Sequence, residues 1–184
     1  MEADPTLKIM ELALQQKPRP FESLVRGKPL AQGREAVAAL SGKPLLIQAA
    51  LYLCFDCFEE AHQIANDHEG TVAGNWTHAI LHRREPDAGN SKYWYARVKV
   101  PAKLGQGIAK EALRVLGEKT ERELEDFREK LAQSGVWEPE AFVDACEKFR
   151  KKDPRLPAYG ALARVQETEW KGLVDFILSS QKQT

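Results

Sequence analysis

The chain has 184 residues, a length typical of one domain that buries its own core. Lysine plus arginine and aspartate plus glutamate each number 27, so the formal net charge is zero, whereas dedicated nucleic-acid-binding proteins usually carry a basic excess. Residues that favour helices (Ala, Leu, Glu, Lys, Arg, Gln and Met) number 101, against 22 for Val, Ile and Thr. We therefore predict a single compact all-α domain over residues 1–184, built of about six to eight helices.

The same composition limits the location and partners of the protein. No apolar run approaches the ~20 residues needed to span a bilayer, and the first residues lack the basic and apolar regions of a secretory signal. Three cysteines, an odd number, fit a reducing compartment better than a disulfide scaffold. We expect a cytoplasmic protein with no membrane partner, and the neutral charge argues against a nucleic-acid partner.

The first third of the chain predicts two helices with a connector between them. Asp4, followed by a proline, predicts the start of an N-terminal helix that ends before Pro18. Residues 17–33 hold three prolines and two glycines, which predicts an ordered connector with at most one short helix. A run that is apolar nearly all round predicts a buried helix over about 44–53.

Short helices joined by tight turns follow. Asp56 has the spacing of a capping box with the glutamate three residues on, which predicts a helix that ends near residue 66. A helix over about 75–85 is stopped by a proline, and Asn90 or Ser91 is positioned to cap the next helix, which reaches about residue 98. Short loops predict that the helices of the 44–100 region pair in antiparallel fashion.

The remaining half predicts one long helix and two shorter ones. Leucines and Phe127 recur at steps of three and four over residues 104–133, which indicates the longest amphipathic helix of the chain. C-terminal helices are expected over about 139–149 and 165–178. No repeat of 33 to 45 residues is present, so we expect an irregular arrangement rather than a regular solenoid.

The histidines are clustered along the sequence. All four, from His62 through His68 and His78 to His82, fall within 21 residues. His78 and His82 are four positions apart and Glu85 follows three later, so these side chains share one helix face. Two imidazoles and a carboxylate at this spacing can hold a divalent ion such as zinc, nickel, manganese or iron. The alternative is a pair of histidines hydrogen-bonded at an interface between helices.

The next helix carries a second aligned set. Asn90, Tyr93, Trp94 and Arg97 lie at positions i, i+3, i+4 and i+7, which places them on one face. An amide, two aromatic rings and a guanidinium suit a pocket wall that binds a carboxylate or phosphate. Ordinary amphipathic packing is the alternative. A short loop containing Asp87 joins this helix to the histidine helix, so the two polar faces are expected to converge.

Two further sequence patterns can be explained by ordinary structural roles as well as by ligand binding. Residues 83–103 carry six basic side chains, Arg83 and Arg84 among them. Such a segment can bind an anionic ligand or a nucleic-acid backbone, and the alternative is that it forms a solvated helix face. Cys54 and Cys57 form a lone CxxC beside His62. Helical geometry prevents that cysteine–histidine set from sharing one ion, so we interpret the cysteines as small buried hydrophobes.

The stretch from Trp76 to Arg97 reads W-x-H-A-I-L-H-R-R-E-P-D-x-x-N-x-x-Y-W-x-x-R. It resembles the signature segment of a family of uncharacterised proteins for which we know no activity. Residues 49–53, 60–65 and 166–175 are similar to other parts of that family. The resemblance implies that one set of residues acts together: His62, His78, His82, Arg83, Glu85, Asp87, Asn90, Tyr93, Trp94 and Arg97.

Two functional hypotheses of different classes follow. In the first, the protein binds a small anionic molecule between the helices around 75–85 and 90–98, with or without a divalent metal ion. The candidate catalytic residues are His78, His82 and Asp87, and an enzymatic version would activate water, as a hydrolase does. The candidate ligand-binding residues are Arg83, Asn90, Tyr93, Trp94 and Arg97. The candidate metal ligands are His78, His82, Glu85 and His62.

The second hypothesis is a non-catalytic helical adaptor. In it the same residues form a buried polar network that fixes helix register, or a groove for a peptide. Replacing His82 by alanine distinguishes the two, because a structural role predicts a loss of a few kcal/mol of stability and a functional role predicts little.

Overall fold

The structure is a computed structural model that describes residues 8, 10, 11, 15, 21–40, 42–117 and 122–180. Within these residues every regular element is a helix, which confirms the all-α prediction for a single compact domain. The nine helices of this part exceed the six to eight expected. They are α2 (Ala31–Ala38), α3 (Leu45–Cys54), α4 (Phe58–Asn66), α5 (Val72–Arg84), α6 (Ala88–Tyr95), α7 (Ala102–Leu116), α8 (Arg122–Ser134), α9 (Pro139–Phe149) and α10 (Pro157–Ser180).

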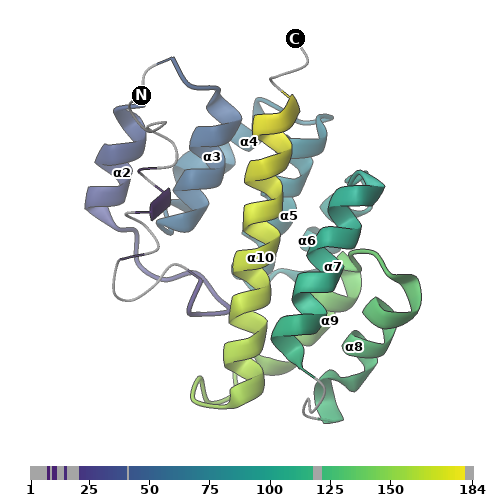
Figure 1. Cartoon of the computed structure of the whole chain (residues 1–184). Coiled ribbons are helices and arrows are strands. Elements are labelled where there is room, and N and C mark those ends of the chain that lie inside the picture. The colour runs from purple at the N-terminus through teal and green to yellow at the C-terminus, as the bar shows by residue number, and fades with distance from the viewer. Residues whose placement is uncertain are drawn as a thin grey trace.

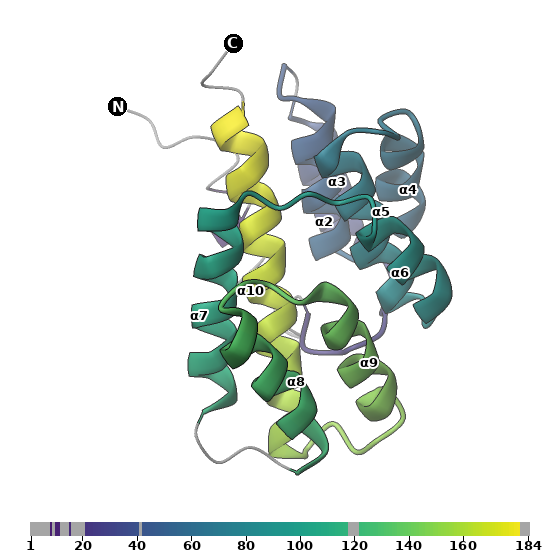
Figure 2. The ribbon, with the colours of Figure 1, turned by 90° about the vertical axis from the view of Figure 1, so that its right-hand side faces the viewer.

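The longest helix, α10, runs through the middle of the molecule (Figure 1) and contacts α3, α5, α7 and α9. It starts at Pro157, eight residues before the predicted start, because proline is compatible with the first turn of a helix. Trp170 is fully buried on it, and its indole N–H donates to the Ala50 carbonyl of α3 at 2.6 Å. Figure 2 shows α7 along one side of α10 and the α3–α6 region on the other.

Helices α3 to α6 form the region that carries the signature segment. Helix α3 packs on α4, and α5 packs on both α4 and α6, as expected for paired helices joined by short loops. Helix α3 is buried over seven of its ten residues, in agreement with its apolar sequence. Helix α6 also contacts α9, which links this region to the C-terminal helices.

The caps of these helices differ from the predicted ones. Asp56 does not cap α4; it has a positive φ of 55° and lies with one carboxylate oxygen 2.8 Å from Arg84. Thr71 caps α5 by accepting from the Gly74 N–H at 3.0 Å. Asp87, rather than Asn90 or Ser91, caps α6. The prediction failed at α4 because a buried arginine is a stronger partner for Asp56 than a helix end.

The predicted long helix over 104–133 is two helices. Helix α7 ends at Leu116 and is followed by Gly117, whose positive φ of 72° favours glycine, and α8 begins at Arg122. Residues 118–121, between them, lie outside the described residues. The apolar side chains predicted on the second half are buried as expected, namely Leu124, Phe127 and Leu131. The hydrophobic period continues across the break, so periodicity alone did not reveal it.

Helix α2 was not predicted, because it is short, has no capping side chain and follows the proline-rich connector. Gly33 lets it approach the turn after α3, since a Cβ there would lie 2.1 Å from the Phe55 ring. The predicted N-terminal helix between Asp4 and Pro18 lies mainly outside the described residues. In the described part of the chain, no helix combines the length and apolar character that crossing a membrane requires.

Candidate functional site

Helix α5 places four polar side chains in three directions. It is buried over twelve of its thirteen residues, so each polar side chain on it must find a partner in the protein. His78 and His82 share one face because they are one turn apart. Arg83 and Arg84 follow directly and therefore point about 100° and 200° away from His82.

His62, His78 and His82 form a group that we call the histidine cluster. His62 comes from α4, and its ring centroid lies 5.1 Å from that of His78 and 5.4 Å from that of His82. The rings of His78 and His82 are parallel within 3° and 6.0 Å apart. The structure therefore brings together the three histidines of the predicted site.

His78 is the innermost member of the histidine cluster and is fully buried. Its Nε2 lies 2.9 Å from the side-chain oxygen of Asn66, at the end of α4. Its Nδ1 is buried without a hydrogen-bond partner among the described residues. Burial, together with the nearby His62 and His82, lowers the pKa of His78 to about 4, so its imidazole is neutral at neutral pH.

His82 lies at the edge of the histidine cluster and is 8% exposed. Its Nδ1 is 3.4 Å from a carboxylate oxygen of Glu85, whose other oxygen is 3.0 Å from the Arg26 guanidinium. Burial lowers the pKa of His82, and the nearby His62 lowers it further. The carboxylates of Glu85 and Asp87 act in the opposite direction, but the net shift of the pKa is downward. The ring is therefore neutral at neutral pH and oriented by a carboxylate.

Helix α6 continues the cluster with aromatic side chains. Trp94 stacks on His78 with ring centroids 4.1 Å apart and planes within 13°. Tyr93, which is 51% exposed, meets Trp94 edge-on at 5.3 Å. The Arg97 guanidinium carbon lies 3.5 Å from the Tyr93 ring centroid, and one of its N–H groups donates to the Tyr93 carbonyl at 2.7 Å. The predicted convergence of the two helix faces is thus present in the structure.

Two other predicted residues lie at the start of α6. The Asp87 carboxylate accepts from the Asn90 backbone N–H at 3.0 Å, which is a helix cap, and it faces His82 only through its charge. The half-buried Asn90 side chain has no hydrogen bond within the part of the chain that the structure describes. Asp87 therefore has a structural task, and the role of Asn90 as a ligand-binding residue stays a prediction.

Arg83 is not positioned to bind a ligand, contrary to the prediction. It is 2% exposed, and it donates to the Glu169 carboxylate of α10 and to the Tyr95 hydroxyl, both at 2.5 Å. Glu169 is fully buried and also accepts from the indole N–H groups of Trp76 and Trp137, at 3.2 and 3.3 Å. Arg83 lies in the core rather than at a ligand site because the buried Glu169 carboxylate, 86 residues away in the sequence, requires a cation as its partner.

Arg84 is a second buried cation, 1% exposed. It donates to the Leu53 carbonyl at 3.1 Å, pairs with Asp56, and its guanidinium carbon lies 4.8 Å from the Phe21 ring centroid. Burial lowers the pKa of Arg84, and Asp56 counteracts that shift. Two of the six basic residues of the 83–103 segment are therefore core residues, and the segment is not one continuous basic surface.

The described residues show no prearranged geometry for the predicted metal site. Within residues 21–40, 42–117 and 122–180, no group of three or more His, Cys, Asp or Glu is arranged to hold a metal ion. In the histidine cluster the rings of His78 and His82 are parallel, so their lone pairs lie in parallel planes, and one nitrogen of His78 faces Asn66. Cys54, Cys57 and Cys146 are free and buried, as predicted for small hydrophobes.

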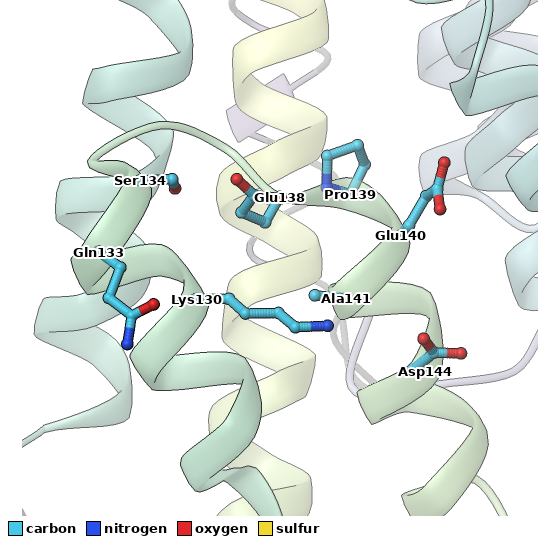
Figure 3. Close-up of a pocket in the computed structure, with 8 residues that line it drawn as sticks. All are labelled: Lys130, Gln133, Ser134, Glu138, Pro139, Glu140, Ala141 and Asp144. Atoms are coloured by element: carbon cyan, nitrogen blue, oxygen red, sulfur yellow. The ribbon is translucent and has the colours of Figure 1, made fainter.

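Three cavities of the described structure lie away from the histidine cluster. The largest, about 750 Å³, is an open hollow between the end of α8 and the start of α9 (Figure 3), where Lys130 extends toward Ala141. A second of about 360 Å³ lies beside it, between α8 and α9. The third, of about 590 Å³, is lined in part by Phe21, Asp56 and Arg84. None of the three is lined by a residue of the predicted site.

Comparisons of the chain with protein-family models, curated protein sequences and solved structures found no match in any of the three. The resemblance of the 76–97 segment to a family of uncharacterised proteins stays a prediction.

Sequence reasoning missed three residues that organise the site. The sequence marks Asn66 only as the expected end of a helix, and it marks Tyr95 only as an aromatic residue next to Trp94. Glu169 offered a usable signal, because it lies four residues after Val165 and four before Leu173 in an apolar stripe. A charged residue at such a position indicates a buried partner.

Proposed function

We propose that this protein binds a small molecule at the histidine cluster and that His82 acts there as a proton acceptor. The observation that carries this proposal is the position of His82: a nearly buried, neutral imidazole with one nitrogen beside Glu85. A carboxylate beside Nδ1 favours a proton on that nitrogen and leaves the lone pair on Nε2. A histidine held in this way is suited to act as a general base.

The neighbours of His82 support a ligand role as well. His62 is half-buried, and neither of its ring nitrogens has a hydrogen bond in the described part of the chain. His78 adds a buried nitrogen without a partner. Buried polar atoms are normally satisfied, so the unpaired His78 nitrogen favours a bound molecule or water that supplies the missing contact.

The charge of the ligand is inferred from α6. Arg97 is exposed, and only one of its N–H groups is used, by the Tyr93 carbonyl. A carboxylate or phosphate fits the remaining guanidinium donors. We therefore propose a small anionic molecule, and water activation as the reaction class if the protein is an enzyme. A metal-dependent version stays a prediction, and elemental analysis of protein purified without a tag or chelator tests it.

The adaptor hypothesis is supported for a different set of residues. Arg83, Glu169 and Tyr95 form a buried polar network between α5, α6 and α10, which suits a role in fixing helix positions. Because this network lies on another face of α5 from His82, it is compatible with a ligand site at the histidine cluster. A cytoplasmic location also remains part of the proposal, supported by three cysteines that are all free.

The test is a thermal-shift screen of small carboxylates, phosphates and their esters against three proteins. Wild type is compared with His82→Gln and with His68→Gln as a matched control. His68 is a half-buried histidine outside the cluster, and its Nδ1 lies 2.8 Å from the backbone carbonyl oxygen of Ile64. We expect ligands that raise the melting temperature of wild type and of His68→Gln but not of His82→Gln. Equal shifts in all three proteins, or no ligand at all, would count against the proposal.

A further inference from the structure

The cavity of about 590 Å³ shares no lining residue with the histidine cluster and has features of a second binding site. It is bounded by the 21–27 segment, the turn at Asp56 and the first half of α10. Its volume falls in the range of about 300–1,000 Å³ typical of small-molecule sites. Its lining residues include Phe21, Glu22, Asp56, Arg84, Gly160 and Arg164.

A buried cation with a spare donor lines this cavity. Arg84 is 1% exposed, and its terminal nitrogens are engaged by Leu53, Val25 and Asp56. Its Nε is buried and has no hydrogen-bond partner among the described residues. This N–H lacks an acceptor, as do two N–H-bearing nitrogens of Arg83, but Arg84, unlike Arg83, borders a cavity in which an acceptor could lie.

The backbone around the cavity is strained. Phe21 and Asp56 both line the cavity and have positive φ values of 63° and 55°. Residues other than glycine rarely adopt this backbone conformation. Strain of this kind concentrates at ligand sites, where the surrounding structure enforces it. Here Asp56 is held by Arg84, and Phe21 packs on Trp170 with ring centroids 5.4 Å apart.

The charges that remain free define the ligand. The Asp56 carboxylate pairs with Arg84, and Glu167 pairs with Lys171 at 2.6 Å. Arg164 is exposed at the rim and has no ion pair in the described part of the chain, and the same holds for Glu22. Arg164 is thus the one spare cation among the described lining residues and can pair with one anionic group, whereas the unpaired Glu22 disfavours any additional negative charge.

We propose that this cavity binds a small organic monoanion with an apolar body. The apolar body lies against Phe21 and Ala163, and the anionic group is bound by Arg164 and by the free N–H of Arg84. This site is independent of the one proposed at the histidine cluster, because the two share no lining residue.

The experiment uses the fluorescent probe 1-anilinonaphthalene-8-sulfonate, which combines aromatic rings with one sulfonate. Gly160→Leu fills the cavity, since Gly160 lines it and a Cβ there meets nothing within 4 Å. Gly107→Leu is the matched control, a helical glycine on α7 with equally open surroundings outside this cavity. We expect saturable binding of one probe per chain, weakened at least about tenfold by Gly160→Leu and less than about twofold by Gly107→Leu.

A charge change supplies an independent arm in case the cavity-filling variant fails to fold. Arg164→Glu is expected to weaken binding about fivefold or more, whereas Lys110→Glu, on the exposed face of α7, leaves it unchanged. The proposal is overturned by an absence of saturable binding to wild type. It is equally overturned if folded Gly160→Leu binds like wild type, if Arg164→Glu and Lys110→Glu behave alike, or if His82→Gln abolishes the signal.

Discussion

Replacing Arg83 by methionine is the perturbation whose cost the structure defines most sharply. The change keeps the length and apolar stem of the side chain but removes the only cation that pairs with the buried Glu169 carboxylate among the described residues. Breaking a buried pair by removing one partner costs about 3–5 kcal/mol, because the other charge stays behind uncompensated. Total stabilities of domains are typically about 5–15 kcal/mol, so we expect a large fraction to be lost.

The double variant Arg83→Met/Glu169→Gln separates a charge pair from ordinary packing. With both charges gone, the glutamine still accepts from Tyr95, Trp76 and Trp137. We expect the double variant to be more stable than the sum of the single changes predicts, with a coupling of at least about 2 kcal/mol.

The assay is urea unfolding followed by far-UV circular dichroism at neutral pH, with Arg97→Met as the exposed control. Arg97 rests on Tyr93 at the surface, so its replacement should leave the unfolding midpoint nearly unchanged. The reasoning is refuted if Arg83→Met costs less than about 1 kcal/mol, or if the single changes simply add.

Three further predictions rest on other parts of the core. Because the folded pKa of His78 is lowered from 6.5 to about 4, the unfolded chain takes up the proton first. Stability contributed by the neutral ring is therefore complete above pH 6.5 and falls by about 3 kcal/mol toward pH 4, and urea unfolding at several pH values should show this slope reduced in His78→Gln. Burial raises the thiol pKa values of Cys54 and Cys146, the latter to about 12, so a thiol reagent should label no cysteine in the native protein and all three after unfolding; rapid native labelling would contradict their burial. Gly74→Ala should destabilise by roughly 2 kcal/mol or more, since its Cβ would lie 2.2 Å from the His68 carbonyl oxygen, and equal stability of wild type and variant in thermal melts would contradict that contact.

The histidine face and the α6 face were predictable because their spacing is local. His78 and His82 are one turn apart, as are Asn90 and Trp94, and helical geometry alone aligns them. Their convergence followed from the short loop at Asp87. His62 entered the prediction only through the resemblance, since its position on another helix is not fixed by local periodicity.

The remaining features depend on partners distant in sequence. Arg83 looked available for a ligand because its partner Glu169 belongs to the last helix. Asp56 looked like a helix cap because nothing local reveals that Arg84 is buried beside it. Gly117 breaks a helix whose apolar period continues on both sides, so only the backbone geometry reveals the break. Long-range pairing of charges, rather than helix formation, was the part that sequence patterns did not predict.

The most direct test of the proton-acceptor role of His82 is a pH titration of the imidazole nitrogens by ¹⁵N NMR, with His82→Gln used to assign the signals. The structure predicts that His82 is neutral at neutral pH, titrates below 6.5, and carries its proton on Nδ1, beside Glu85. A His82 ring that is charged at neutral pH, or one with its proton on Nε2, would contradict the account.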